Sequence, residues 1–288
     1  MTRRAIMALM LSAAVLALSG CVGAIGTGTL TPKLSPPIIA RPGILRAAVD
    51  TSFPPFAGKV GSETVGLDVD VAAAIAEQLG LKLEIYDVNQ PAAAALVQSG
   101  TVDIMLGALT VDAAVSSQVG FAGTYVSDAP ALFASKDATF SLPASGSADA
   151  TSLIAAIADK RIAVQQGSLA YWLLLDQVGE THLQVTTTLD DAFKAASAGS
   201  ADCVAGDALV GSYMLRTYPK FLYEGQLGSA YPLGVGVGQA NTKLETEVRT
   251  ILDKLASEGV LQTLRRKWMG DLVPLRVTDV AAETSTTP

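Results

Sequence analysis

The chain contains few residues that bind metal ions. Among its 288 residues it has two cysteines, Cys21 and Cys203, and one histidine, His182. Zinc sites need several cysteine or histidine ligands close together, and no such cluster exists in the sequence. We therefore expect no metal and no cofactor.

Basic residues are also scarce. The sequence has 20 Lys and Arg against 27 Asp and Glu, which gives a formal net charge of −7. An acidic chain is not attracted to a phosphate backbone, so nucleic acid is excluded as a partner. The scarcity is greatest from Leu83 to Ser135, where there is no Lys or Arg. An anionic ligand group held by this segment would lack a cationic partner.

Long apolar runs are missing beyond the N-terminus. Arg3 and Arg4 precede an apolar run from Ala5 to Leu18. A helix that spans a membrane needs about 20 apolar residues, and neither this run nor any later one reaches that length. Basic residues followed by a short apolar run are typical of a secretory signal peptide, which we predict over residues 1–20.

The predicted signal peptide ends at Leu18-Ser19-Gly20-Cys21, which resembles the bacterial lipobox. In a lipobox, a diacylglyceryl group alkylates the cysteine thiol, and anchors with two or more acyl chains are stable. The resemblance predicts lipid attachment at Cys21 and an extracytoplasmic protein anchored to the cell membrane. The alternative is an ordinary signal peptide with a chance cysteine. A lipidated Cys21 cannot form a disulfide, so Cys203 is predicted to be a small core side chain.

Two segments have the composition of unfolded chain. Residues 21–43 combine Gly, Thr, Pro and Ser with scattered aliphatic residues, so we predict a lipid anchor and flexible linker there. Residues 273–288 are predicted to be a disordered tail. The residues between these segments suffice for one large domain or two ordinary ones.

Predicted strands and helices alternate between these segments, and the pattern restarts in the second half. The alternation predicts parallel sheets covered on both faces, and its repetition predicts an α/β fold with two lobes. Ligands of such folds lie at the carboxyl ends of the strands. The predicted strands are residues 44–50, 81–88, 102–106, 161–165, 183–187 and 201–205, and the predicted helices are 71–79, 92–99, 169–178, 189–197, 208–215, 244–257 and 260–268.

Six short segments resemble the family 3 solute-binding proteins, the receptors of polar amino-acid ABC importers. The resemblance covers nearly all of residues 44–272, and it depends on the order and spacing of the segments rather than on any single one. The segments are Val49-Asp-Thr-Ser-Phe-Pro-Pro-Phe56, Gly66-Leu-Asp-Val-Asp70, Leu96-Val-Gln-Ser-Gly-Thr-Val-Asp103, Val164-Gln-Gln-Gly-Ser168, Asp202 to Asp207 and Lys267-Trp-Met-Gly270.

The resemblance implies a two-lobed periplasmic-binding-protein-like fold of type II, in which each lobe is a sheet flanked by helices. Lobe 1 is expected at residues 44–131 plus 236–272, and lobe 2 at residues 137–230. Crossing segments near 131–136 and 231–236 would act as hinges that let the lobes close over a ligand. The implied partners are a small polar ligand and an ABC transporter permease, and the implied protein is a monomer and not an enzyme.

In lobe 1 the resemblance places Asp50, Phe53 and Gln90 at the ligand. Asp50 ends a predicted strand, where its carboxylate could accept a hydrogen bond from a cationic or hydroxyl group, or could cap the following turn. Phe53 could offer an aromatic face. Gln90 stands where the family often has an aromatic side chain, so its amide favours a hydrogen-bonding ligand.

The largest departure from the family concerns the ligand's α-carboxylate. The family holds this group with hydroxyl or amide positions that match Ala108 and Thr110, and with an arginine whose position is Val115 here. Enclosing a ligand carboxylate without its bidentate arginine partner makes the binding free energy less favourable by about 3–5 kcal/mol. The sequence therefore predicts a ligand without a free carboxylate.

In lobe 2 the resemblance places Gly167, Ser168, Leu169 and Asp207 at the ligand. Gly167 and Ser168 open a predicted helix, whose first backbone N–H groups can hold an anion or a carbonyl. Leu169 stands where a threonine is common and offers its backbone amide. Asp207 matches the acid that binds the ligand's α-ammonium, although it could instead cap the helix that follows.

Together these positions predict capture of an amino acid or, given Val115, an amine or other non-carboxylate analogue for an ABC importer. One alternative is a ligand-sensing module without transport, and another is a degenerate receptor without a ligand. A third is a dehydratase-like enzyme on the same fold. The sequence argues against the enzyme, because such dehydratases rely on the missing arginine and His182 lies away from the matched positions.

Overall fold

The computed structural model describes residues 31–107, 119–143, 149–271 and 275. The predicted signal peptide, Cys21, Ala108, Thr110 and Val115 lie outside these residues. Within the described residues, no helix combines the length and the apolar character needed to cross a membrane.

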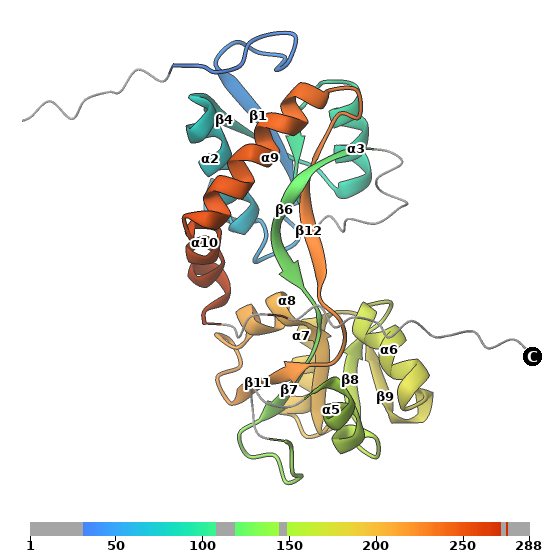
Figure 1. Cartoon of the computed structure of the whole chain (residues 1–288). Coiled ribbons are helices and arrows are strands. Elements are labelled where there is room, and N and C mark those ends of the chain that lie inside the picture. The colour runs from blue at the N-terminus through green and yellow to red at the C-terminus, as the bar shows by residue number, and fades with distance from the viewer. Residues whose placement is uncertain (1–30, 108–118, 144–148, 272–274, 276–288) are drawn as a thin grey trace, which may run out of the picture. The chain divides into compact units, whose positions relative to one another are not determined.

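The first sheet contains β4 (Lys82–Asp87), β1 (Ile44–Val49), β5 (Ile104–Met105), β12 (Tyr231–Val237) and β6 (Gly120–Asp128), in that order across the sheet (Figure 1). Strands β4, β1 and β5 are parallel to one another, whereas β12 is antiparallel to β5 and β6. The sheet is thus mixed and not parallel as predicted, because β12 arrives directly from the second sheet without a crossover helix.

The second sheet contains β11 (Phe221–Gln226), β7 (Pro130–Ser135), β10 (Cys203–Asp207), β8 (Ile162–Gln165) and β9 (Leu183–Thr186), in that order. Strands β8, β9 and β10 are parallel, and β7 is antiparallel to β10 and β11. The prediction of a parallel sheet is therefore wrong here for the same reason, since β7 enters directly from the first sheet.

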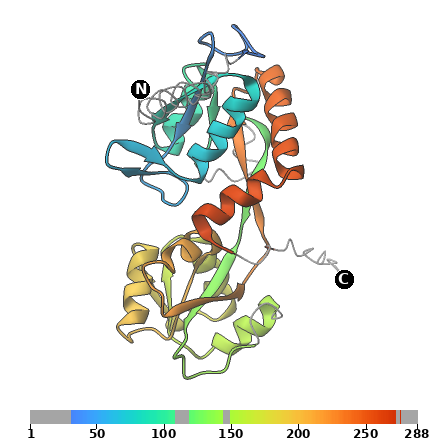
Figure 2. The ribbon, with the colours of Figure 1, turned by 90° about the vertical axis from the view of Figure 1, so that its left-hand side faces the viewer.

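Helices pack against both sheets, as predicted for an α/β fold. Figure 2 shows two helices of the first lobe, α9 (Thr242–Ser257) and α10 (Val260–Met269), meeting at an angle. The other helices of this lobe are α2 (Leu67–Leu79) and α3 (Gln90–Gln98), and a hairpin joins β2 (Gly58–Val60) to β3 (Glu63–Val65). The second sheet carries α5 (Ala150–Ile157), α6 (Leu169–Gln177), the 3₁₀ turn η1 (Glu180–His182), α7 (Leu189–Ser197) and α8 (Ala208–Met214).

The central strands of the second sheet, β7, β8 and β10, are buried on both faces, which explains their continuous apolar residues, whereas the edge strand β9 is partly exposed. In β8, Ile162 and Val164 belong to one apolar cluster, and Ala163 between them belongs to another. Successive residues of a strand point to opposite faces, so a sheet covered on both sides needs apolar residues at every position. Cys203 of β10 is fully buried in the first of these clusters, which confirms its prediction as a core residue.

The chain passes from the first sheet to the second at Ala129 and returns through residues 227–230. The predicted crossing segments 131–136 and 231–236 are instead largely strand residues of β7 and β12. Each crossover lies a few residues closer to the N-terminus than predicted. We define lobe 1 below as the part with the first sheet, and lobe 2 as the part with the second.

The last part of the predicted linker is folded onto lobe 1. Leu34 and Ile39 are buried in its core, and the backbone N–H of Lys33 donates to the carbonyl of Leu79 over 2.9 Å. The prediction of a flexible linker up to residue 43 is therefore wrong for this stretch, because two buried aliphatic side chains and backbone hydrogen bonds to lobe 1 hold it. Leu275, within the predicted tail, likewise packs against the apolar clusters.

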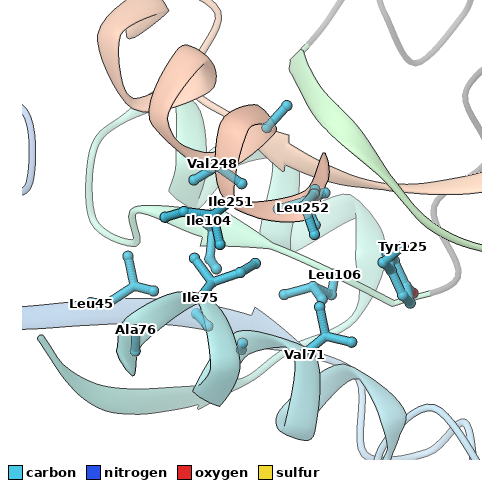
Figure 3. Packing of buried hydrophobic residues seen from close by; sticks show 14 of the residues in the cluster. Leu45, Val71, Ile75, Ala76, Ile104, Leu106, Tyr125, Val248, Ile251 and Leu252 are labelled. Atoms are coloured by element: carbon cyan, nitrogen blue, oxygen red, sulfur yellow. The ribbon is translucent and has the colours of Figure 1, made fainter. Parts of the chain in front are cut away.

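The core of lobe 1 lies between α2, α9 and the first sheet. Figure 3 shows Val71 and Ile75 of α2 on the side that faces Leu252 of α9. Spacings of three and four residues place such side chains on one face of a helix, and burying each contributes about 1.5–3 kcal/mol. Tyr125 borders this core, and its hydroxyl donates to the fully buried Asp68 over 2.6 Å.

Candidate functional site

The turn after β1 holds two of the predicted ligand residues. Asp50 accepts through Oδ1 from the backbone N–H of Ser52 at 3.0 Å and from its hydroxyl at 2.5 Å, which is the turn-capping arrangement. The Phe53 side chain is 40% exposed, and its ring stacks on that of the buried Phe56 with the centroids 5.6 Å apart. Phe56 thus fixes the Phe53 ring while part of it stays accessible to a ligand.

A cleft of about 620 Å³ lies beside Phe53 and has walls from both lobes. Ser52, Phe53 and Pro54 line it from lobe 1, and Gln165 and Thr188 are among the residues that line it from lobe 2. Clefts of this size hold small molecules, and walls from two lobes are typical of sites that close around a ligand.

The start of α6 holds three further predicted residues. Gly167 has φ 75°, a left-handed conformation that favours glycine, and precedes the cap residue Ser168. The Ser168 hydroxyl accepts from the backbone N–H of Tyr171 at 3.1 Å and donates to the carbonyl of Gln165 at 2.9 Å. The side chain of Ser168 therefore serves the helix itself, while Leu169 is exposed.

Asp207 begins α8, but its side chain makes no capping hydrogen bond to that helix. Asp128, the last residue of β6, does so instead: its Oδ1 accepts from the backbone N–H of Leu209 at 3.0 Å and of Ala129 at 2.8 Å. Asp207 thus occupies the N-cap position of α8, as the alternative predicted, but its side chain does not cap the helix. The Tyr231 hydroxyl lies 3.4 Å from Oδ1 of Asp207, to which it donates.

The environment of the two acids favours their protonated or cation-bound forms. Burial, together with the nearby charge of Asp207, raises the pKa of Asp128 to about 8. Burial also raises the pKa of Asp207, although the hydrogen bond from Tyr231 opposes this. Burial raises the pKa of Tyr223 to about 12 and that of Tyr231 further, so both phenols are protonated at neutral pH.

The remaining predicted positions are only partly described. Gln90 is the first residue of α3, which Asn89 caps by accepting from the backbone N–H of Ala92 at 3.1 Å. Ala108, Thr110 and Val115 belong to the segment outside the described residues. The structure thus brings Asp207 together with Asp128 and Tyr231, and it places Phe53 in the cleft between the lobes.

Possible metal ligands are not grouped among the described residues. Within residues 31–107, 119–143, 149–271 and 275, no three His, Cys, Asp or Glu side chains are grouped so that they could hold one. Burial raises the pKa of the Cys203 thiol to about 12, so this group is a neutral thiol at neutral pH.

The family of the chain follows from comparison with known proteins. The sequence model of the bacterial extracellular solute-binding proteins, family 3, matches residues 45–271. The chain belongs to this family. Its members bind solutes outside the cytoplasm, which agrees with a two-lobed fold that has a cleft between its lobes.

Individual relatives are distant in sequence. ABC transporter arginine-binding protein 1 of Escherichia coli (strain K12) is 24% identical over 234 residues, which cover 76% of this chain and 88% of that protein. ABC transporter glutamine-binding protein GlnH of Bacillus subtilis (strain 168) is 21% identical over 210 residues, which cover 72% and 73%.

A solved structure confirms the two-lobed fold. The ancestral cationic amino acid solute binding protein AncCDT-1 superposes with a TM-score of 0.69 at 22% identity, covering 79% of this chain and 96% of that one. With another of its solved structures, the AncCDT-1 protein is described as a precursor of cyclohexadienyl dehydratase. The names of the family and of both curated relatives describe binding proteins and not enzymes.

Asp128 and Tyr231 are the functional candidates that sequence reasoning missed. Asp128 lies 79 residues before Asp207 in the chain, and only the antiparallel pairing of β7 with β10 brings them together. A signal was present in the sequence, since the acid Asp128 directly precedes the apolar run from Ala129 to Ala134. Acids are rarely buried without a partner, so an acid beside this run indicates that a partner group lies near it in the fold.

Proposed function

We propose that this solute-binding protein captures a small cationic or amide ligand that lacks a free carboxylate. The observation that carries the proposal is the closeness of Asp207 to the buried Asp128, with no ion pair from either acid to a Lys or Arg among the residues that the structure describes. Two enclosed carboxyl groups favour a ligand that brings positive charge.

The cleft supplies the other expected contact. Phe53 is exposed on its wall and held by Phe56, so its ring can receive a cationic or planar ligand group. Cation–π contacts of this kind contribute about 0.5–2 kcal/mol, depending on exposure to water. Asp207 does not line this cleft, so the lobes would have to close further before Phe53 and Asp207 held one ligand from two sides.

The absent arginine limits the ligand class. Relatives of this chain are named for binding arginine or glutamine, both of which carry an α-carboxylate. In this sequence Val115 occupies the position of the carboxylate-binding arginine, and no Lys or Arg occurs from Leu83 to Ser135. A bound α-carboxylate would lose its charge-assisted pair, which favours an amine or amide over an amino acid.

Delivery to an ABC importer and a lipid anchor on Cys21 complete the proposal. The curated relatives are named as parts of ABC transporters, and closure of two lobes around a ligand is a change that a permease can recognise. The lipobox-like Leu18 to Cys21 supports the anchor. Replacing Cys21 with Ala should move the expressed protein from the membrane fraction to the soluble fraction.

Calorimetry with matched ligands tests the ligand class. The purified full-length chain is titrated with arginine and with agmatine, which keeps the guanidinium group and lacks the carboxylate. Glutamine and 4-aminobutanamide form a second pair. We expect the decarboxylated member of a pair to bind at least about tenfold more tightly, which corresponds to about 1.4 kcal/mol.

The variants Asp207→Asn and Thr110→Val complete this experiment. Asp207→Asn should abolish binding of agmatine, because it removes the charge that holds the cation. Tight binding of arginine or glutamine that is unaffected by Thr110→Val would refute the proposed ligand class.

A further inference from the structure

Asp128 connects the two lobes at the point where the chain crosses between the sheets. It ends β6 in the first sheet, Ala129 follows, and Pro130 begins β7 in the second sheet. The Asp128 side chain is 3% exposed, and its Oδ1 binds the backbone N–H groups of Ala129 and Leu209. Two backbone donors and the crossover between the sheets fix this carboxyl group in place.

The strand registers bring Asp207 and Tyr231 to the same place. Asp207 pairs with Pro130 across β10 and β7, and Tyr231 pairs with Asp128 across β12 and β6. The Tyr231 hydroxyl reaches from there to the Asp207 carboxyl group. Three strands that are distant in sequence thus place two carboxyl groups and a phenol together.

Among the residues that the structure describes, no Lys or Arg forms an ion pair with Asp128 or Asp207. The groups that act on Asp128 from the surrounding elements are Asp207 and the backbone N–H groups that begin α8, and Tyr223 and Tyr231 respond to its charge. Arg265 of α10 lines a neighbouring cavity beside Leu209, and its pKa responds to burial, to Arg266 and to Asp271. Two adjacent carboxylates with no cation are costly to enclose, so one proton or one cation must be held between them.

We propose that Asp128 makes ligand capture at Asp207 proton-linked: the ligand-free pair holds one proton, and a ligand ammonium or guanidinium group displaces it. Charge and protons balance in this exchange. The pair loses its proton to the buffer and passes from one negative charge to two, and the bound cation neutralises one of these charges. Asp128 is then a positioning residue that acts through Asp207. The inference rests on the proposed function, since it assumes a cationic ligand at Asp207.

Calorimetry measures the released proton directly. Agmatine is titrated into the full-length chain at pH 7 in buffers that differ in ionisation enthalpy, and the dependence of the observed enthalpy on the buffer gives the number of protons released. We expect release of about one proton per ligand, and affinity that rises about tenfold per pH unit between pH 6 and 8. The number of released protons and the dependence of the affinity on pH should both become small above pH 9.

Asp128→Asn tests whether this residue causes the linkage. The Asn side chain keeps an oxygen that can accept from Ala129 and Leu209, so the crossover can be preserved, but it cannot share a proton with Asp207. We expect proton release to fall to near zero and the affinity to become independent of pH. Asp202→Asn is the matched control, because Asp202 precedes the same strand, β10, and pairs with the exposed Arg161.

The inference is overturned if the wild type releases no proton, or if Asp128→Asn releases as many as the wild type. If agmatine does not bind at all, the proposed function fails, and a measurement without ligand still tests the pair. The free energy of unfolding of the ligand-free wild type should fall between pH 6 and 8 relative to Asp128→Asn. If the difference in the free energy of unfolding between the two proteins does not change with pH, the pair does not share a proton. If Asp128→Asn does not fold, Asp207→Asn takes its place in this measurement.

Discussion

Lobe 1 and the crossover each bury an acid, and the two acids are satisfied in opposite ways. Asp103 of lobe 1 accepts from the Arg46 backbone N–H at 2.8 Å, from its guanidinium at 3.1 and 3.2 Å, and from the Ala40 backbone N–H at 3.1 Å. Asp128 at the crossover accepts from two backbone N–H groups and faces a second acid, Asp207.

This difference separates a structural acid from a functional one. All the hydrogen-bonding capacity that Asp103 presents is taken up by neighbours within its own lobe, so a ligand could gain nothing there. Among the residues that the structure describes, no cation pairs with Asp128 or Asp207, so the two acids favour a shared proton or a bound cation. Charge balance, and not burial, distinguishes the two sites.

The largest expected effect is on stability, when each acid is removed in turn. Asp103→Ala leaves the Arg46 guanidinium buried without its partner, so we expect a loss of about 3–5 kcal/mol in the free energy of unfolding. Asp128→Asn keeps an acceptor for both backbone N–H groups and should cost less than about 1 kcal/mol at pH 7. Urea unfolding followed by circular dichroism measures both, and equal losses would contradict the distinction.

The next largest effect is on ligand affinity, when an arginine is introduced at the ligand site. Asp103 already has such a partner in Arg46. Val115→Arg restores the family's carboxylate-binding residue, and hydrogen bonds between charged groups contribute about 1.5–3 kcal/mol. We expect the affinity for arginine to rise about 10–100-fold by calorimetry. Val115→Met is the control of similar length without charge, and an equal gain with this variant would show that charge is not the reason.

The pH dependence of stability gives a smaller effect with a definite sign. The pKa of Asp128 in the folded protein is raised to about 8, well above that of an exposed carboxyl group. The folded state therefore binds a proton more tightly than the unfolded state, and stability falls as the pH rises towards 8. We expect the wild type to lose about 1–2 kcal/mol relative to Asp128→Asn between pH 6 and 8.

Differential scanning calorimetry across this pH range checks the sign. Burial raises the pKa of Asp68 to about 7, but this residue is present in both proteins and cancels in the comparison. A wild type that gains stability relative to Asp128→Asn as the pH rises would show that the carboxylate, and not the proton, is favoured at this site.

Local signals in the sequence were sufficient for the parallel parts of both lobes. Helix α7 was predicted with both of its ends, Leu189 and Ser197, and Gly80 ends α2 in the left-handed conformation that a C-terminal cap requires. Strand β12 was not predicted, because Pro232, Gly234 and Gly236 are turn signals that only the sheet pairing overrides. Its partner β6 was missed with it.

The candidate site was predictable only where it follows a local motif. Phe53 was predicted from its match to the family resemblance and lines the cleft, and its contact with a ligand stays a prediction. Asp50 and Ser168 were predicted in the same way, but the Asp50 side chain accepts a hydrogen bond within its own turn, and the Ser168 side chain caps α6. Asp128 could not be found by motif, because its role arises from the crossing of four strands whose pairing the sequence does not display.

The smallest expected effect comes from Tyr231, whose hydroxyl supports the charged form of Asp207. Tyr231→Phe removes one long hydrogen bond, of 3.4 Å, and should change stability little. Without this donor, Asp207 holds a proton more readily, so we expect agmatine to bind about 2–10-fold more weakly at pH 7, which corresponds to about 0.5–1.5 kcal/mol.

The pH profile shows whether this loss arises from the proton. A displaced proton predicts that the variant regains wild-type affinity at pH 9, where the pair is ionised in both proteins, whereas a lost packing contact predicts the same deficit at every pH. Tyr86→Phe is the control, because its hydroxyl donates to Glu84 at 2.8 Å in lobe 1. If Tyr231→Phe regains the wild-type affinity for agmatine at high pH and Tyr86→Phe never loses it, the effect arises from protonation of Asp207. Asp103, whose carboxylate is fully paired, has no such dependence on a single neighbouring hydroxyl.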